Sequence, residues 1–256
     1  MKYYEAFLQQ RCFRFEDAVR LIGSENAALT TLRQYIKKGY IVKIRRGLYA
    51  AVNLLDHEPA ASQYLIASKL TDTAVVSHHA AFAYHGYANQ VSYEIGVTSE
   101  TKFNPFSFGG FRYRRLAPQI RQGVIRTADG ARITDVERTV LDSVNDFEND
   151  MGFEELLQCI SSIPVLNEKK LSAYLSEYDK CFLYQKTGFI LEHFQNELAV
   201  SDGFLALCKE RAGNSSRYLM GGIPKNKMEF SAKWRLTIPK NVWNNTMNGG
   251  DENADV

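Results

Sequence analysis

Three groups of side chains have the residue types and spacing that chemistry requires. The first contains His78, His79 and His85, and histidine is a common zinc ligand. A zinc site on a helix would place two histidines four residues apart, with a further ligand nearby, but the chain has no H-E-x-x-H motif and no matching cysteine. We therefore interpret these histidines as hydrogen-bonding residues of a packed helix, and we expect no metal and no cofactor.

Carboxylates form the second group, in the segment 134–142. Asp135, Glu137 and Asp142 are of the type with which nucleases hold Mg²⁺. The same residues also suit the start of a helix, because Thr134 or Asp135 can cap it and acids in the first turn favour the helix dipole. No lysine follows at the short spacing of a restriction-type nuclease core. Helix capping is the favoured interpretation.

The third group alternates rings and cations, from Phe111 to Arg115. Such a strand either contacts a nucleic acid or turns a basic face to solvent, and the pattern favours neither. Elsewhere the chain contains no Gly-rich nucleotide cradle and no G-x-S-x-G nucleophile motif. The sequence therefore predicts a protein that is not an enzyme.

Composition sets the broad class of the protein. The chain has 256 residues, of which 45% are apolar and 23% charged, as in ordinary globular proteins. This length favours two domains or one large domain. No segment approaches the roughly 18 apolar residues of a membrane span, and the first residues do not resemble a signal peptide. The four cysteines form no C-x-x-C pair, which is typical of a cytoplasmic protein with reduced thiols.

Positive charge is concentrated at the N-terminus. Residues 1–50 hold ten Lys and Arg against four Asp and Glu, a net charge of +6 in a chain whose total is +2. The remainder is therefore mildly acidic, with a net charge of −4. A basic segment joined to a larger acidic body is expected when one end of a protein meets a polyanion.

The basic segment has the layout of a winged helix-turn-helix. Apolar spacing predicts helices over 3–10 and 15–22, and Gly23 ends the second. Ser24 is a suitable N-cap for a third helix that runs to about Lys38. Residues 40–50 are then predicted to form a basic β-hairpin, which is the wing of this layout, because Ile and Val flank an Arg-Gly turn.

The third helix would lie in the major groove of DNA. Its core stripe is expected to contain Ala28, Leu29, Leu32 and Ile36, with Tyr35 beside them. Asn and Gln on the opposite face can pair with adenine, and Thr can touch the thymine methyl group, whereas cations on the wing would meet phosphates. A protein-binding module is the alternative, but it should expose apolar anchors. The predicted DNA-binding residues are Asn26, Thr30, Thr31, Arg33, Gln34, Lys37, Lys38, Lys43, Arg45 and Arg46.

The remaining chain mixes helices with short strands. Strands are predicted at 74–76, 93–97, 106–116 and 233–238, and a β-hairpin with its turn at Asp129-Gly130 is predicted at 125–134. Helices are predicted at 63–70, 77–85, 136–147, 152–162, 167–178, 183–200 and 203–211. The fold class is therefore α+β (mixed α/β). We expect a winged helix-turn-helix domain at 1–56, a larger and mainly helical α/β domain with a small sheet at 57–243, and a mobile polar tail at 244–256.

Four segments in order resemble the AbiEi antitoxins of type IV toxin–antitoxin, or abortive infection, systems. They are the N-terminal winged helix ending in Arg45-Arg46-Gly47-Leu48-Tyr49, the helix Ser77–Gly86, the segment Ile133–Asp142 and the segment Leu183–Glu192. Ala80 stands where the family pattern suggests Ser. The resemblance covers the chain to about residue 243.

The resemblance implies two activities linked to phage defence. The winged helix would bind inverted repeats in the promoter of its own operon and repress transcription, with possible self-association on DNA. The larger domain would oppose a nucleotidyltransferase toxin without forming a stable complex, and its candidate residues are Glu137, Arg138, Gln185 and Lys186. The alternative is a nucleic-acid-processing enzyme, a metal-dependent nuclease or a nucleotide-modifying domain, targeted by the winged helix.

Overall fold

A computed structural model describes residues 2–240 and 242–243 of the protein. The chain folds into two compact units. Unit 1 comprises Met1–Ser77, Tyr93–Pro118 and Val124–Ile133, and unit 2 comprises the remaining segments, of which Thr134–Val256 is the longest. Helices and several small sheets occur together, so the predicted α+β class is confirmed. None of the helices in the described residues is both long and apolar enough to span a membrane.

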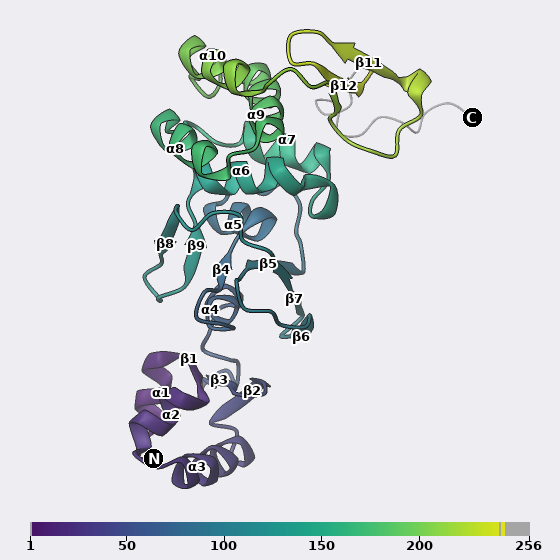
Figure 1. The fold of residues 1–256 in the computed structure, drawn as a ribbon. Coiled ribbons are helices and arrows are strands. Elements are labelled where there is room, and N and C mark those ends of the chain that lie inside the picture. The colour runs from purple at the N-terminus through teal and green to yellow at the C-terminus, as the bar shows by residue number, and fades with distance from the viewer. Residues whose placement is uncertain (1, 241, 244–256) are drawn as a thin grey trace, which may run out of the picture. The chain divides into compact units, whose positions relative to one another are not determined.

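The N-terminal module, residues 2–52, consists of three helices and a small sheet (Figure 1). Strand β3 lies in the middle of this sheet and pairs antiparallel with both β1 and β2. Gly47, in the β2–β3 turn, has a φ of 78°, which glycine adopts without the penalty that a Cβ atom brings. The elements are α1 (Tyr4–Gln10), β1 (Cys12–Arg14), α2 (Phe15–Ile22), α3 (Glu25–Lys37), β2 (Ile41–Arg45) and β3 (Leu48–Ala51).

Aromatic rings hold this module together. Phe7 of α1 stacks on Phe13 of β1 with ring centroids 4.2 Å apart, and Phe7 also meets the edge of Tyr35 of α3 at 6.1 Å. Tyr49 of β3 lies 5.9 Å from the ring of Phe13. Phe7 and Phe13 are fully buried. Because such aromatic pairs combine a large buried area with a preferred geometry, they fix the position of α3 relative to the sheet.

The second sheet of the chain has six strands in the order β6-β7-β5-β4-β9-β8. β5 runs parallel to β7, β4 runs parallel to β9, and β4 and β5 are antiparallel. The helix α4 (Gln63–Ser68) packs on β4 and β5. The strands are β4 (Val75–Val76), β5 (Glu94–Thr98), β6 (Phe106–Phe108), β7 (Phe111–Leu116), β8 (Val124–Arg126) and β9 (Arg132–Thr134).

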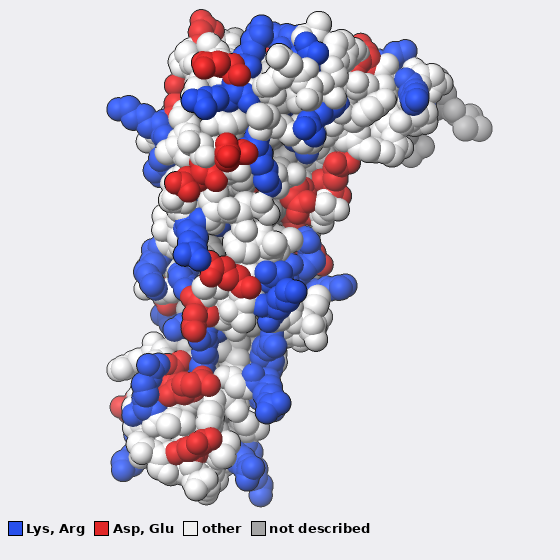
Figure 2. All heavy atoms as spheres, in the orientation of Figure 1, with Lys and Arg blue, Asp and Glu red and all other residues white. Residues whose placement is uncertain are grey.

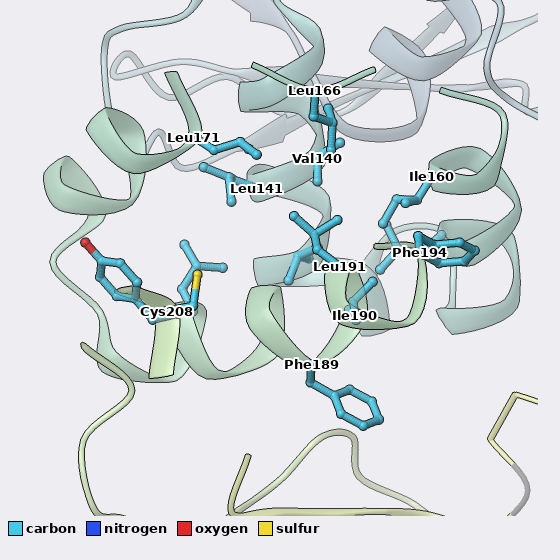
Figure 3. Packing of buried hydrophobic residues seen from close by; sticks show 14 of the residues in the cluster. Val140, Leu141, Ile160, Leu166, Leu171, Phe189, Ile190, Leu191, Phe194 and Cys208 are labelled. Atoms are coloured by element: carbon cyan, nitrogen blue, oxygen red, sulfur yellow. The ribbon is translucent and has the colours of Figure 1, made fainter. Parts of the chain in front are cut away.

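Unit 2 is a group of helices around one apolar core. Figure 3 shows Leu191 of α9 pointing toward Val140 of α6, while Phe189 points to the other side of α9. Leu191 and Val140 are completely buried, so α9 runs through the middle of this core. The helices are α5 (His78–His85), α6 (Val136–Asp146), α7 (Phe153–Ser161), α8 (Glu168–Tyr178), α9 (Cys181–His193) and α10 (Asp202–Arg211), with a short 3₁₀ helix at Phe147–Asn149.

A small C-terminal sheet completes unit 2. β12 (Leu236–Pro239) lies between β10 (Arg217–Tyr218) and β11 (Met228–Ser231), and a 3₁₀ helix at Lys225–Lys227 precedes β11. Trp234, which is 2% exposed, joins this region to α9. Its indole N–H donates to Glu192 at 2.7 Å, and its ring fills the space beside Gly188.

Element positions follow the sequence-based predictions with a few differences. The strands β1, β10 and β11 were not predicted, and α9 ends at His193 rather than at residue 200. The predicted tail, 244–256, lies outside the described residues. The domain boundary at residue 56 stays a prediction, because the compact unit that contains the N-terminal module also contains most of the six-stranded sheet.

We predict that Gly188→Ala destabilises the protein. A Cβ atom at this position would lie 2.2 Å from two ring atoms of Trp234, and overpacking of a core costs about 1–3 kcal/mol. Urea unfolding should show this loss. The matched control is Gly203→Ala, also in a helix, where the nearest atom is 3.6 Å away. Equal stabilities of the two variants would contradict the packing that we describe.

Candidate nucleic-acid interface

The outward face of α3 is mainly polar, although Leu29 and Ile36 are also exposed. Ala28, Leu32 and Tyr35 are buried against the module, and residues on the opposite side of a helix point to solvent. The exposed predicted DNA-binding residues on this helix and at its end are Asn26, Thr30, Arg33, Gln34, Lys37 and Lys38. The hydroxyl of Thr30 donates to the carbonyl of Asn26 at 3.0 Å, so this side chain can offer a partner its methyl group and the acceptor side of its hydroxyl oxygen.

The rotation of α3 differs from the predicted one in three respects. Leu29 and Ile36 were expected in the core, but they are 37% and 39% exposed. Thr31 was expected on the outward face and is half-buried. Tyr35 replaces Leu29 and Ile36 in the core because its ring meets those of Phe7 and Tyr40. The outward face is therefore centred closer to Arg33 than the sequence pattern suggested.

The wing presents cations of two kinds. Lys43 and Arg46 are exposed, as expected for side chains that meet phosphates. Arg45 is half-buried, and its guanidinium lies 5.0 Å from the ring of Phe106 and 5.8 Å from that of Phe103. One of its terminal nitrogens, Nη1, is buried without a hydrogen-bond partner. Arg45 thus joins the wing to the six-stranded sheet, a contact that the sequence did not reveal.

Two arginines donate hydrogen bonds to backbone carbonyls at the C-terminal end of α4. Arg14, at the start of α2, donates through Nε to the Lys69 carbonyl at 2.8 Å and pairs with Asp72. Arg132 of β9 donates to the carbonyls of Ser68 and Thr71 at 2.8 and 3.0 Å. Cations satisfy the free carbonyls at the end of a helix. Neither arginine was singled out from the sequence, since their convergence depends on the tertiary fold.

The acidic residues around α6 are engaged by neighbouring side chains. Asp135 caps the helix by accepting from the Arg138 amide at 3.0 Å, as predicted, and its other oxygen accepts from Tyr174 at 2.8 Å. Lys170 lies 3.0 Å from Asp135 and 3.3 Å from Glu137. Burial and the hydrogen bond to Asp135 raise the pKa of Tyr174 to about 12. This arrangement supports the capping interpretation over a magnesium site.

Arg138 and Asp142 form a buried ion pair in the same helix. Both side chains are 2% exposed, and Nε of Arg138 lies 3.2 Å from Asp142. Arg138 also donates to the Gln122 carbonyl at 2.6 Å, and Tyr178 donates to Asp142. Burial and the adjacent Asp142 raise the pKa of Tyr178 well above its usual value. A buried charge is tolerated when it is paired and hydrogen-bonded, so Arg138 has a structural role here.

Glu137 and Gln185, two other predicted antitoxin candidates, also make structural contacts. Glu137 accepts from the Asn167 amide at 3.0 Å, at the start of α8. Gln185 donates from its side-chain amide to the carbonyls of Trp234 and Ser215 at 2.6 and 3.1 Å. These bonds attach α8 and the C-terminal sheet to the helical core.

Lys186, the remaining candidate, is a buried cation between two rings. Its Nζ lies 4.6 Å from the ring centroid of Phe147 and 4.7 Å from that of Phe182, and the residue is 5% exposed. Burial lowers the pKa of Lys186, while the charges of Glu148 and Asp146 oppose this effect. Cation–π attraction partly replaces the lost hydration.

The histidines have local partners, as predicted. His85 Nε2 lies 2.8 Å from the Thr134 carbonyl, and since a carbonyl only accepts, the ring nitrogen donates. His79 Nε2 lies 2.9 Å from Glu155, whose same oxygen also accepts from the amides of Asn89 and Gln90 at 3.0 Å.

His79, Glu155 and Cys159 are the residues best placed to hold a metal in the described part of the chain, with ligand atoms within 4.8 Å of one another. Burial and the nearby Glu155 raise the pKa of Cys159, so in the absence of a metal the thiol stays protonated and donates to that carboxylate at 3.4 Å. Hydrogen bonds engage Nε2 of His79 and one oxygen of Glu155, whereas Nδ1 of His79 and the other oxygen of Glu155 are buried without a hydrogen-bond partner.

The rings and cations of β7 belong to the sheet. Tyr113 is fully buried and stacks on Phe106 at 4.9 Å. Arg114 pairs with Glu94, and Nε of Arg115 donates to the Ser99 carbonyl at 2.8 Å. Arg112 is exposed, but Arg114 and Arg115 are half-buried, so this strand does not turn a wholly basic face to solvent as one of the two interpretations expected.

Comparison with known proteins supports the assignment of the N-terminal module. Residues 1–52 match a family model described as "Transcriptional regulator, AbiEi antitoxin". No curated protein matches the chain. Among solved structures, the crystal structure of the RV2827C protein from Mycobacterium tuberculosis has a similar fold, with a TM-score of 0.59 and 12% sequence identity over 92% of this chain and 89% of the other. At this identity the likeness concerns the fold alone.

The family match covers the segment in which the winged helix-turn-helix was predicted, and the matched family is described as one of transcriptional regulators and antitoxins. The resemblance drawn from the sequence is therefore confirmed over residues 1–52, which are similar to the AbiEi antitoxin transcriptional regulators.

Proposed function

We propose that this protein is the antitoxin and transcriptional autorepressor of a type IV toxin–antitoxin operon. The N-terminal module binds inverted repeats in its own promoter, with α3 in the major groove and the wing on the phosphate backbone. Residues 57–243 oppose a nucleotidyltransferase toxin without forming a stable complex with it. The protein acts in the cytoplasm, where both its DNA and its toxin are found.

The outward face of α3 is the observation that carries the DNA-binding part of the proposal. A helix that reads base edges needs amide and cationic side chains on one exposed face. Asn26, Gln34 and Arg33 lie on such a face, while the opposite side of the helix is buried. Lys43 and Arg46 supply exposed charge from the adjacent wing, and the family match lies in this module.

The antitoxin part of the proposal rests on the family match. In unit 2, Glu137, Arg138 and Gln185 make hydrogen bonds or an ion pair that connect parts of the fold. Lys186 instead contacts two aromatic rings, so it is the candidate whose role in the fold is least clearly defined by its contacts. The alternative, a metal-dependent nuclease, gains no support from Asp135 and Asp142, because other side chains already bind both carboxylates.

We predict that Gln34→Ala reduces discrimination between promoter DNA and unrelated DNA. Loss of one good base contact costs about 1–3 kcal/mol on the specific site, while binding to unrelated duplex should stay unchanged. Fluorescence anisotropy with both duplexes measures the ratio. The control is Gln10→Ala, at the exposed end of α1, which should keep the wild-type ratio. Equal losses by Gln34→Ala on both duplexes would contradict base reading by this face.

We predict that Arg46→Ala weakens binding to every DNA sequence alike. Each lost phosphate contact lowers the slope of log affinity against log salt concentration by about 0.9, and contacts to phosphate carry no sequence information. Titrations at several salt concentrations measure this slope. Lys209→Ala, which removes an exposed cation from α10, is the matched control. An unchanged slope for Arg46→Ala would remove the wing from the interface.

A further inference from the structure

A large charged cleft lies within unit 1, apart from the outward face of α3. Its volume is about 810 Å³, which is in the range of pockets that hold a small organic ligand. One wall comes from α2 and the β2–β3 turn, with Arg14, Arg20, Arg45 and Arg46. The other comes from the end of α4 and the β8–β9 hairpin, with Lys69, Arg126 and Arg132.

Positive charge predominates in this cleft. The seven cations of its lining face three acids, Glu16, Asp17 and Asp72. Asp72 pairs with Arg14 and Asp17 with Arg20, which leaves five cations and one acid, Glu16, outside these ion pairs. Figure 2 shows Lys and Arg side chains beside the β2–β3 hairpin and over the β8–β9 hairpin. The excess of positive charge raises the local concentration of anions.

Several cations of the cleft are free to bind a ligand. Arg46 and Arg126 are exposed and Lys69 is half-exposed, and within the described residues none of the three has an acidic partner within ion-pair distance. Arg45 contributes a terminal nitrogen, Nη1, that is buried without a hydrogen-bond partner. An unsatisfied buried donor is costly, and an anion in the cleft is the kind of partner that would satisfy it.

The cations also crowd one another. Burial lowers the pKa of Arg132, and the neighbouring charges of Arg126 and Arg14 lower it further, against the opposite effect of Asp72. Arg132 and Arg14 donate hydrogen bonds to the carbonyls at the end of α4. These bonds hold both guanidinium groups in position. A bound anion would relieve this repulsion.

We propose that this cleft is a binding site for a ligand that carries adjacent phosphate groups. Guanidinium groups match the geometry of phosphate oxygens, and the free cations stand on both walls, so that two neighbouring phosphates are held better than one. The phosphates belong either to a free nucleotide-like molecule or to a nucleic-acid backbone. The site is separate from the base-reading face of α3, so it does not depend on the proposed promoter specificity.

The test uses the full chain with inorganic pyrophosphate and, in a second arm, a short duplex of unrelated sequence. Calorimetry at moderate salt measures binding of each probe to wild type, to Arg126→Ala and to the double variant Arg126→Ala with Lys69→Ala. Each lost charge-assisted contact should weaken binding of the probe about tenfold or more. Arg112→Ala is the charge-matched control, because Arg112 is an exposed arginine of the same unit that does not line the cleft.

The outcomes separate the two phosphate sources. Pyrophosphate binding that is lost in Arg126→Ala identifies a free phosphate ligand, whereas a loss confined to the duplex arm identifies a nucleic-acid backbone. Absence of binding by both probes, or equal affinities of wild type, Arg126→Ala and Arg112→Ala, overturns the proposal. Arg126→Ala alters one exposed side chain, so the single variant remains informative if the double variant unfolds. Promoter specificity tested through Gln34 is unaffected by any of these results.

Discussion

Aromatic packing between α1, β1 and α3 is the constraint on which the proposed interface depends. Phe7 stacks on Phe13 and meets the edge of Tyr35, and this contact selects which side of α3 is buried. Once Tyr35 is inside, the residues half a turn away must face solvent. Asn26, Thr30 and Arg33 are therefore exposed as a consequence of ring packing rather than of their own preferences.

The chain combines this exposed face with a second basic region built in a different way. On α3 the polar residues come from one helix, so a local pattern places them. In the charged cleft, Arg45, Lys69 and Arg126 come from three separate elements of unit 1. Arg14 and Arg132 position the end of α4 between them. The N-terminal module thus takes part in two positively charged surfaces with different origins.

The sequence predicted those features that local patterns determine. The helices α2 and α3 appear where apolar spacing and the stop at Gly23 placed them, and the hairpin follows from the Arg-Gly turn. The strand β1 has three residues and exists because it pairs with β3, a contact across more than thirty residues that no local pattern reveals. The burial of Tyr35 in place of Leu29, the stacking of Arg45 on Phe106 and the cleft depend equally on tertiary contacts.

The placement of α3 in the major groove is tested most directly by a footprint of the protein on the DNA upstream of its own gene. Dimethyl sulfate reports access to N7 of guanine in the major groove, where α3 is placed. With α3 in the major groove, we expect protected guanines in two half-sites related by two-fold symmetry, about one helical turn or a multiple of it apart, at concentrations that leave unrelated DNA unprotected. Uniform protection of all sequences, or no protection in the major groove at saturating protein, would contradict this expectation.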